Sequence, residues 1–187
     1  MNLASRTVNS KLQDIRVLVL DVDGVLTDGR IHYGGAGEMI KSFNAKDGLG
    51  IKMLQFVGIG VAVITARKSD ALARRMYDLG IEHFFPGRPD KTAAVDELTQ
   101  QLGVTLNALA YVGDDVLDLP VLRRVGLSIA VADAHAVVRD AVSWVTQAKG
   151  GDGAVREVSD LLLGRERPLV QVYDEYLQSL EAGSAGE

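Results

Sequence analysis

Short β-branched apolar runs alternate with longer helical segments along most of this chain, and this alternation limits its fold more than any other feature. Strand-sized runs lie at 17–20, 61–65, 83–85, 108–112, 127–131 and 144–145. Helical patterns lie at 48–57, 69–79, 91–102, 116–125, 135–141, 154–163 and 168–181. The pattern predicts an α/β fold with three layers, in which helices cover both faces of a Rossmann-like parallel sheet. The 187 residues suit a single domain over 1–187.

One segment departs from the alternation directly after the first strand. Residues 30–43 read RIHYGGAGEMIKSF, with two short strand-like runs around a glycine-rich turn. This predicts a β-hairpin. Because a projecting hairpin has unpaired edges that favour pairing with another chain, we expect it to serve subunit contact.

Composition excludes several classes of protein. The chain has 20 Lys and Arg against 25 Asp and Glu, a net charge of −5, which gives no basis for binding nucleic acid or an anionic membrane. It has no cysteine, so disulfides, thiolate metal sites and cysteine nucleophiles are absent. It also lacks the apolar run that a membrane span or signal peptide needs. We therefore expect a cytoplasmic protein.

Polar residues follow several of the expected strands. Asp21 and Asp23 follow the first strand, Thr65 ends the second, Lys91 opens the helix after the third, and Asp114 follows the fourth. Because ligands bind beyond the carboxyl ends of parallel strands, we expect these side chains to meet. Converging carboxylates need a cation, and all-oxygen ligands suit Mg²⁺. A lysine and a hydroxyl beside the metal favour phosphoryl transfer, with Asp21 as nucleophile and Asp23 as general acid/base.

Each of these residues also has an ordinary structural explanation. The acids after the first strand suit a turn, and Asp114 with Asp115 suits a helix N-cap, although capping does not exclude metal binding. Asp118, four residues beyond Asp114, either faces the same way or lies on the solvated side of its helix. Lys91 also suits a solvated helix position, and Thr65 an ordinary strand end.

Four ordered motifs carry a resemblance to a known family. They are DVDGVLTDG from Asp21, ITARK from Ile64, the helix-opening Lys91, and GDDVLDLP from Gly113. Over residues 17–131 the chain resembles the haloacid dehalogenase superfamily. The resemblance implies that Asp21 is the nucleophile and Asp23 the general acid/base.

The same resemblance implies the remaining roles. Thr65 and Lys91 would bind the phosphoryl group. Mg²⁺ would be held by Asp21, the backbone carbonyl of Asp23, and Asp114. Asp115 and Asp118 would support these ligands from behind.

Many members of this superfamily carry a separate cap domain that covers the site. A folded cap needs roughly 50 residues or more, and neither residues 24–43 nor residues 66–90 leave room for one. We therefore expect a capless protein whose open site is roofed by a neighbouring subunit in a symmetric oligomer.

Further features resemble one capless family, the 3-deoxy-D-manno-octulosonate 8-phosphate phosphatases, over about residues 15–163. These features are the hairpin, FNAKDG at 43–48, Arg67, and GGDGAVREV at 150–158. The resemblance implies a homotetramer whose hairpins meet centrally and whose C-terminal segments, here 164–187, help close neighbouring sites. It also implies a set of contacts to the sugar-acid phosphate: Asp23, Asn44, Ala45, Lys46, Asp47, Gly48, Lys52, Arg67, Arg75 and Lys91.

The chain departs from that family's pattern at three positions. Ala66 stands where the family usually has Gly, and Lys46 and Lys52 stand where Arg is common. Lysine keeps the charge but loses the bidentate fork, which puts the grip on a sugar carboxylate in question. On a solvated helix face, Lys46, Lys52 and Arg75 would have no role in binding. Arg156 would either cap or form a salt bridge within its own helix, or contribute to the site.

The expected function is Mg²⁺-dependent hydrolysis of 3-deoxy-D-manno-octulosonate 8-phosphate through an aspartyl-phosphate, within lipopolysaccharide biosynthesis. The alternative enzyme is a phosphatase for a sialic-acid-type nonulosonate 9-phosphate, whose reacting end is similar. A non-catalytic assembly module of the same fold is the alternative outside enzymes, and the intact Asp21 and Asp23 argue against it.

Overall fold

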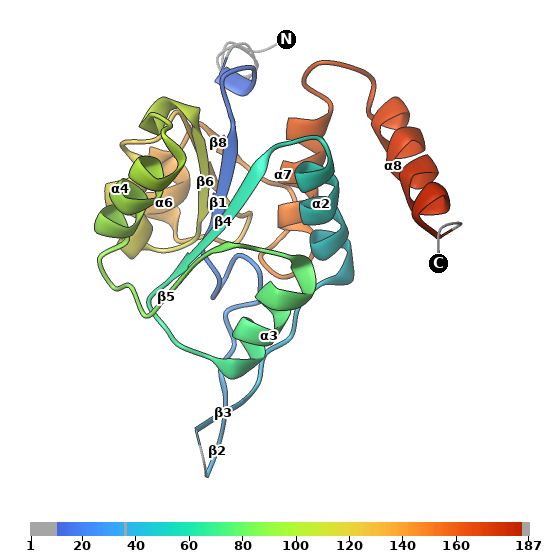
Figure 1. Cartoon of the computed structure of the whole chain (residues 1–187). Coiled ribbons are helices and arrows are strands. Elements are labelled where there is room, and N and C mark those ends of the chain that lie inside the picture. The colour runs from blue at the N-terminus through green and yellow to red at the C-terminus, as the bar shows by residue number, and fades with distance from the viewer. Residues whose placement is uncertain (1–10, 36, 185–187) are drawn as a thin grey trace.

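The structure, a computed structural model, describes residues 11–35 and 37–184 and is organised around a six-stranded parallel sheet (Figure 1). The strand order is β5-β4-β1-β6-β7-β8, and neighbouring strands all run parallel. The strands are β1 (Val17–Leu20), β4 (Gly60–Thr65), β5 (His83–Pro86), β6 (Leu109–Gly113), β7 (Leu127–Ala130) and β8 (Trp144–Val145). β1, β6 and β7 are buried at each residue, which explains why they appear as continuous apolar runs.

Helices cover both faces of this sheet, which confirms the predicted three-layer α/β fold. Figure 1 shows α2 and α7 on one face and α4 and α6 on the other. The helices are α2 (Ala45–Phe56), α3 (Asp70–Leu79), α4 (Lys91–Leu102), α5 (Leu119–Leu122), α6 (Ala136–Ala141), α7 (Ala154–Leu163) and α8 (Leu169–Ser184). Because the chain passes from β1 to β4 on one side and returns to β6 on the other, the carboxyl end of β1 is the switch point where ligands bind in such sheets.

The hairpin expected after β1 is a two-stranded antiparallel ribbon that consists of β2 (His32–Gly34) and β3 (Gly37–Ile40). It projects beyond the carboxyl end of the main sheet (Figure 1). The chain between Thr65 and Lys91 holds only α3 and β5, which belong to the main fold. The described residues therefore contain no cap domain, as the segment lengths predicted.

Two helices differ from the sequence prediction. The helix expected at 116–125 is a short 3₁₀ turn, Val116–Asp118, followed by the four-residue α5 with Pro120 near its start. The helix expected from 48 begins at Ala45, because the Asn44 side chain accepts a hydrogen bond from the Lys46 N–H and caps it.

α8 packs against its own chain. Val172 is buried, the Tyr176 ring meets Phe56 of α2 edge-on with centroids 5.5 Å apart, and the Tyr173 hydroxyl donates to Asp160 of α7 at 2.7 Å. Within the part of the chain that the structure describes, no helix combines the length and the apolar character required to cross a bilayer.

Candidate active site

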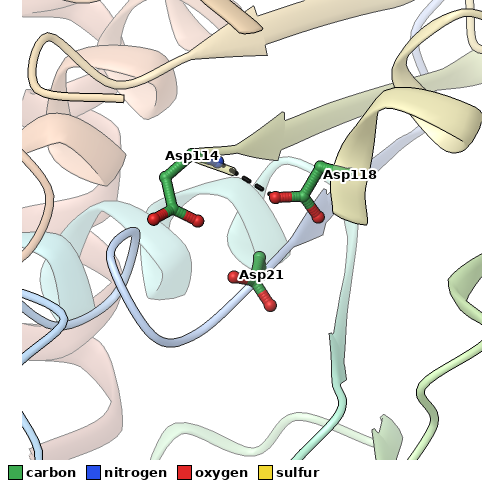
Figure 2. A group of neighbouring side chains, drawn as sticks. All are labelled: Asp21, Asp114 and Asp118. Carbon is green, nitrogen blue, oxygen red and sulfur yellow. Dashed lines mark hydrogen bonds between the residues drawn. The ribbon is translucent and has the colours of Figure 1, made fainter. Parts of the chain in front are cut away.

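Three aspartates converge at the carboxyl edge of the sheet. Asp21 follows β1, Asp114 follows β6, and Asp118 ends the 3₁₀ turn after it (Figure 2). One carboxylate oxygen from each lies within 4.8 Å of the others. Asp21 is 6% exposed and Asp118 only 1%, so these charges are held largely out of water.

The 3₁₀ turn after β6 holds Asp118 in this cluster. Its Oδ2 accepts hydrogen bonds from the backbone N–H groups of Asp114, at 3.0 Å, and Asp115, at 3.3 Å. Its Oδ1 accepts from the Tyr111 hydroxyl at 2.7 Å. A buried tyrosine requires such a partner, and the resulting contacts fix the Asp118 carboxylate before any ligand arrives.

Lys91 is the cation of the cluster. It is the first residue of α4, whose start is capped by Asp90, and it is only 6% exposed. Its Nζ lies 2.8 Å from Asp21 Oδ1 and 2.6 Å from Asp118 Oδ1. Burial by itself would lower the pKa of Lys91, but attraction to the two carboxylates outweighs it and raises that pKa.

One lysine does not neutralise three carboxylates. Burial, together with repulsion from Asp21 and Asp118, raises the pKa of Asp114 to about 8. Burial also raises the pKa of Asp21 to about 6, although Lys91 acts in the opposite direction. A hard divalent cation with oxygen ligands would relieve this repulsion, so the residues present fit Mg²⁺.

Mg²⁺ is therefore expected to stabilise the protein. At a concentration of 100 times Kd, a ligand that binds only the folded state adds about 2.7 kcal/mol, which for a chain of this size raises Tm by roughly 5–10 °C. Differential scanning fluorimetry of metal-free protein with added Mg²⁺ checks this. Asp114→Asn should lose most of the shift, whereas the exposed Asp140→Asn on α6 should keep it.

Asp23 is half-buried and lies two residues beyond Asp21. Its Oδ1 contacts the Lys41 ammonium, and its Oδ2 lies 3.7 Å from Arg67 Nε. Lys41 follows β3, and its side chain is 2% exposed. Arg67 also donates to the Tyr33 hydroxyl of β2 at 2.7 Å. The hairpin thus contributes two side chains to the surroundings of Asp23.

The end of β4 brings Thr65 and Arg67 to the same edge. Thr65 is 2% exposed, and its Oγ1 accepts a hydrogen bond from the Arg67 N–H at 3.2 Å. That bond turns the chain after β4, so that Arg67 extends towards Asp23 while Ala66 is exposed.

The predicted sugar contacts lie around the start of α2. Arg75 of α3 donates to the Asn44 carbonyl at 3.5 Å and stacks on Phe43, with its guanidinium 5.8 Å from the ring centroid. Gly48 leaves room for this, because a Cβ there would lie 2.2 Å from an Arg75 nitrogen. Three other predicted sugar contacts are exposed on α2. Ala45 and Lys46 lie in its first turn, and Lys52 lies further along the helix.

Three predicted residues make other contacts. Asp47 is buried and accepts from the backbone of Arg156 at 2.8 Å. Asp115 is exposed, and its carboxylate accepts from the Val116 N–H at the 3₁₀ turn. Arg156 itself binds Asp160, at 2.7 Å, and the Tyr173 hydroxyl, at 2.8 Å.

Sequence reasoning missed Lys41, Tyr111 and Tyr33. Tyr111 had a usable signal, since a hydroxyl within the apolar run before Gly113 needs a buried partner. Lys41 and Tyr33 had none, because only the path of the hairpin brings them to Asp23 and Arg67.

Comparisons with known proteins agree with this geometry. Residues 78–158 match the haloacid dehalogenase-like hydrolase family. The chain is 51% identical over 156 residues to 3-deoxy-D-manno-octulosonate 8-phosphate phosphatase KdsC of Haemophilus influenzae, covering 83% of this chain and 87% of that protein.

Two solved structures are similar throughout. The cobalt-bound deoxy-D-mannose-octulosonate 8-phosphate phosphatase of H. influenzae has a TM-score of 0.82 and 51% identity, covering 83% of this chain and 91% of that one. The Moraxella catarrhalis 3-deoxy-D-manno-octulosonate 8-phosphate phosphatase, in complex with magnesium, phosphate and KDO, has a TM-score of 0.86 and 36% identity. That comparison covers 96% of this chain and 99% of the other.

Proposed function

We propose a reaction and a role for each site residue from one premise. This chain belongs to the 3-deoxy-D-manno-octulosonate 8-phosphate phosphatases among the haloacid dehalogenase-like hydrolases. The protein is a phosphoric monoester hydrolase that uses Mg²⁺ to release phosphate from 3-deoxy-D-manno-octulosonate 8-phosphate. The observation that carries this is the group of buried Asp21, Asp118 and Lys91 with half-buried Asp114 at the switch point of the sheet.

Asp21 is the proposed nucleophile. A carboxylate oxygen attacks phosphorus, the bond between phosphorus and the sugar oxygen breaks, and an aspartyl-phosphate forms. Water then attacks phosphorus, which releases phosphate and restores the carboxylate. The hydrogen-bonded Lys91, 2.8 Å away, keeps Asp21 oriented towards the crevice.

Asp23 is the proposed general acid/base. It gives a proton to the departing sugar oxygen and later takes one from the attacking water. Its side chain is 20% exposed against 8% for Asp21, which supports this role, because the general acid must reach the leaving group and then water. Lys41 and Arg67 hold both oxygens of the free carboxylate.

The phosphoryl oxygens are bound by the Thr65 hydroxyl and the Lys91 ammonium in this proposal. Asp21, Asp114 and the backbone carbonyl of Asp23 would hold Mg²⁺, with Asp118 behind them. When bound, the metal supplies positive charge that stabilises the developing charge on the phosphoryl group.

In this proposal the sugar acid is recognised by cationic residues beside Asp23 and around the start of α2. Arg67 and Arg75 would meet the carboxylate and hydroxyl groups, with Lys52 and the 44–48 segment beside them. The reaction serves lipopolysaccharide biosynthesis in the cytoplasm, and a chain without cysteine suits that reducing compartment.

Phosphate release tests this function. We expect turnover of 3-deoxy-D-manno-octulosonate 8-phosphate that requires Mg²⁺ and stops on its removal with a chelator, and turnover of glucose 6-phosphate at least about a hundredfold slower. Equal rates with both esters would overturn the substrate assignment. Turnover of neither ester would overturn the assignment as an enzyme.

The proposed assembly is a homotetramer whose hairpins meet. The support is that β2 and β3 project beyond the sheet, and that three large apolar side chains are exposed on these strands or directly before them: Ile31 at 37%, Tyr33 at 67% and Ile40 at 58%. Exposed apolar groups gathered on a strand pair favour burial against another copy.

A charge at the hairpin is expected to break this assembly. Ile40→Glu would bury an unpaired carboxylate at the contact, so analytical ultracentrifugation should show the mass falling to that of smaller species. Val137→Glu, on α6 and 50% exposed, is the matched control and should leave the mass unchanged. A wild-type protein that sediments as a monomer contradicts the proposed assembly.

A further inference from the structure

Asp47 is a buried carboxylate whose neighbours are not those of a substrate contact. It lies in the first turn of α2 and is 1% exposed. Its Oδ1 accepts a hydrogen bond from the backbone N–H of Arg156 at 2.8 Å, across to α7. Its Oδ2 is buried and has no hydrogen-bond partner among the described residues. Such a side chain is fixed by the protein interior and faces a helix terminus.

α7 needs this contact because it lacks a cap of its own. The residue before it is Gly153, which has a φ of 97° and no side chain to accept a hydrogen bond. Arg156 is the third residue of the helix, and its N–H is one of those that an N-cap side chain normally satisfies. Asp47 therefore caps the N-terminus of α7 from a different helix. It accepts the hydrogen bond that a Ser, Thr, Asn or Asp side chain at position 153 would otherwise accept.

The loop that leads into α7, residues 150–153, is in direct backbone contact with the loop that carries Asp23. The Gly151 N–H donates to the Val25 carbonyl at 2.9 Å. A Cβ on Gly150 would lie 1.7 Å from the Gly24 carbonyl oxygen, so the two backbones touch at a distance that only glycine allows. The position of residues 150–153 therefore sets the position of residues 23–25.

We propose that Asp47 is a positioning residue for phosphate ester hydrolysis: by capping α7 from α2, it holds the 150–153 loop against the loop that carries the general acid/base Asp23. This rests on the proposed function, and it replaces the expectation that Asp47 binds substrate.

Two substitutions separate a cap from a substrate contact. Asn at 47 keeps an oxygen that accepts from the Arg156 N–H, whereas Ala removes it. A cap predicts that Asp47→Ala lowers kcat about tenfold with little change in KM, and that Asp47→Asn restores kcat to within about threefold of wild type. The loss of kcat should be smaller for p-nitrophenyl phosphate than for 3-deoxy-D-manno-octulosonate 8-phosphate, because p-nitrophenolate is a good leaving group and depends less on the proton that Asp23 gives.

The assay runs with Mg²⁺ at 25 °C on folded protein, together with wild type and Ile15→Val. Ile15 is fully buried just before β1, at the opposite end of that strand from Asp21, so this variant controls for lost stability alone and should keep its kcat. A rise in KM for the sugar ester in both Asp47 variants would overturn the proposal in favour of a substrate contact. An unchanged kcat in Asp47→Ala would overturn it as well. A wild type without activity would instead refute the proposed function.

Discussion

Asp21→Asn is expected to abolish phosphate release, with kcat falling at least about a thousandfold, as for other enzymes that lose a covalent nucleophile. The amide keeps the shape of the carboxylate but does not form the aspartyl-phosphate. Lys91 retains its contact with Asp118 at 2.6 Å, so the fold should persist. Because burial raises the pKa of Asp21, removing this charge should leave the Tm of metal-free protein unchanged or higher.

Phosphate release and Tm are measured on the same preparation. Asp140→Asn, the same change on the exposed face of α6, should match wild type in both. If Asp21→Asn kept its kcat within tenfold of wild type while remaining folded, Asp21 would not be the nucleophile.

Lys91→Met is expected to be the most destabilising of the site variants. Methionine keeps the length of the side chain but removes the cation that lies 2.8 Å from Asp21 and 2.6 Å from Asp118. Breaking a buried ion pair in this way costs about 3–5 kcal/mol, because the remaining carboxylates are left without compensation. Metal-free Lys91→Met should therefore melt roughly 6–20 °C below wild type, and its turnover should be lost.

Thermal melts with and without Mg²⁺ identify the cause. Added metal should restore part of the lost Tm, since it compensates the same carboxylates, but it should not restore turnover. Lys91→Arg should remain impaired, because the planar guanidinium does not occupy the place of a compact ammonium between two carboxylates. A metal-free Lys91→Met that melts like wild type would contradict the electrostatic account of the cluster.

The strands could be predicted from the local sequence pattern wherever all residues of a strand are buried. β1, β6 and β7 are buried on both faces, so their apolar runs predicted them directly. The prediction was less accurate at the ends of helices. The helix expected at 116–125 opens as the 3₁₀ turn Val116–Asp118, where the Asp118 carboxylate accepts from the Asp114 and Asp115 N–H groups, and its α-helical part, α5, ends at Leu122.

The convergence of the site was predictable for residues at strand ends. Asp21 and Asp114 meet, and Thr65 ends the neighbouring strand at the same edge, because parallel strands end at one edge of the sheet. The contacts of Asp47 and Lys41 were not predictable, because each partner lies on another element. Asp47 reaches Arg156, far along the sequence, and Lys41 reaches Asp23 only through the turn of the hairpin.

The most direct test of the central claim is a competition between two substrates in one mixture. Wild-type protein with Mg²⁺ receives equal amounts of 3-deoxy-D-manno-octulosonate 8-phosphate and a nonulosonate 9-phosphate, and the loss of each ester is followed by phosphorus NMR. We predict that the eight-carbon ester disappears first, with kcat/KM favouring it by at least about tenfold. Preferential loss of the nine-carbon ester would contradict the assignment while leaving the proposed aspartyl-phosphate chemistry intact.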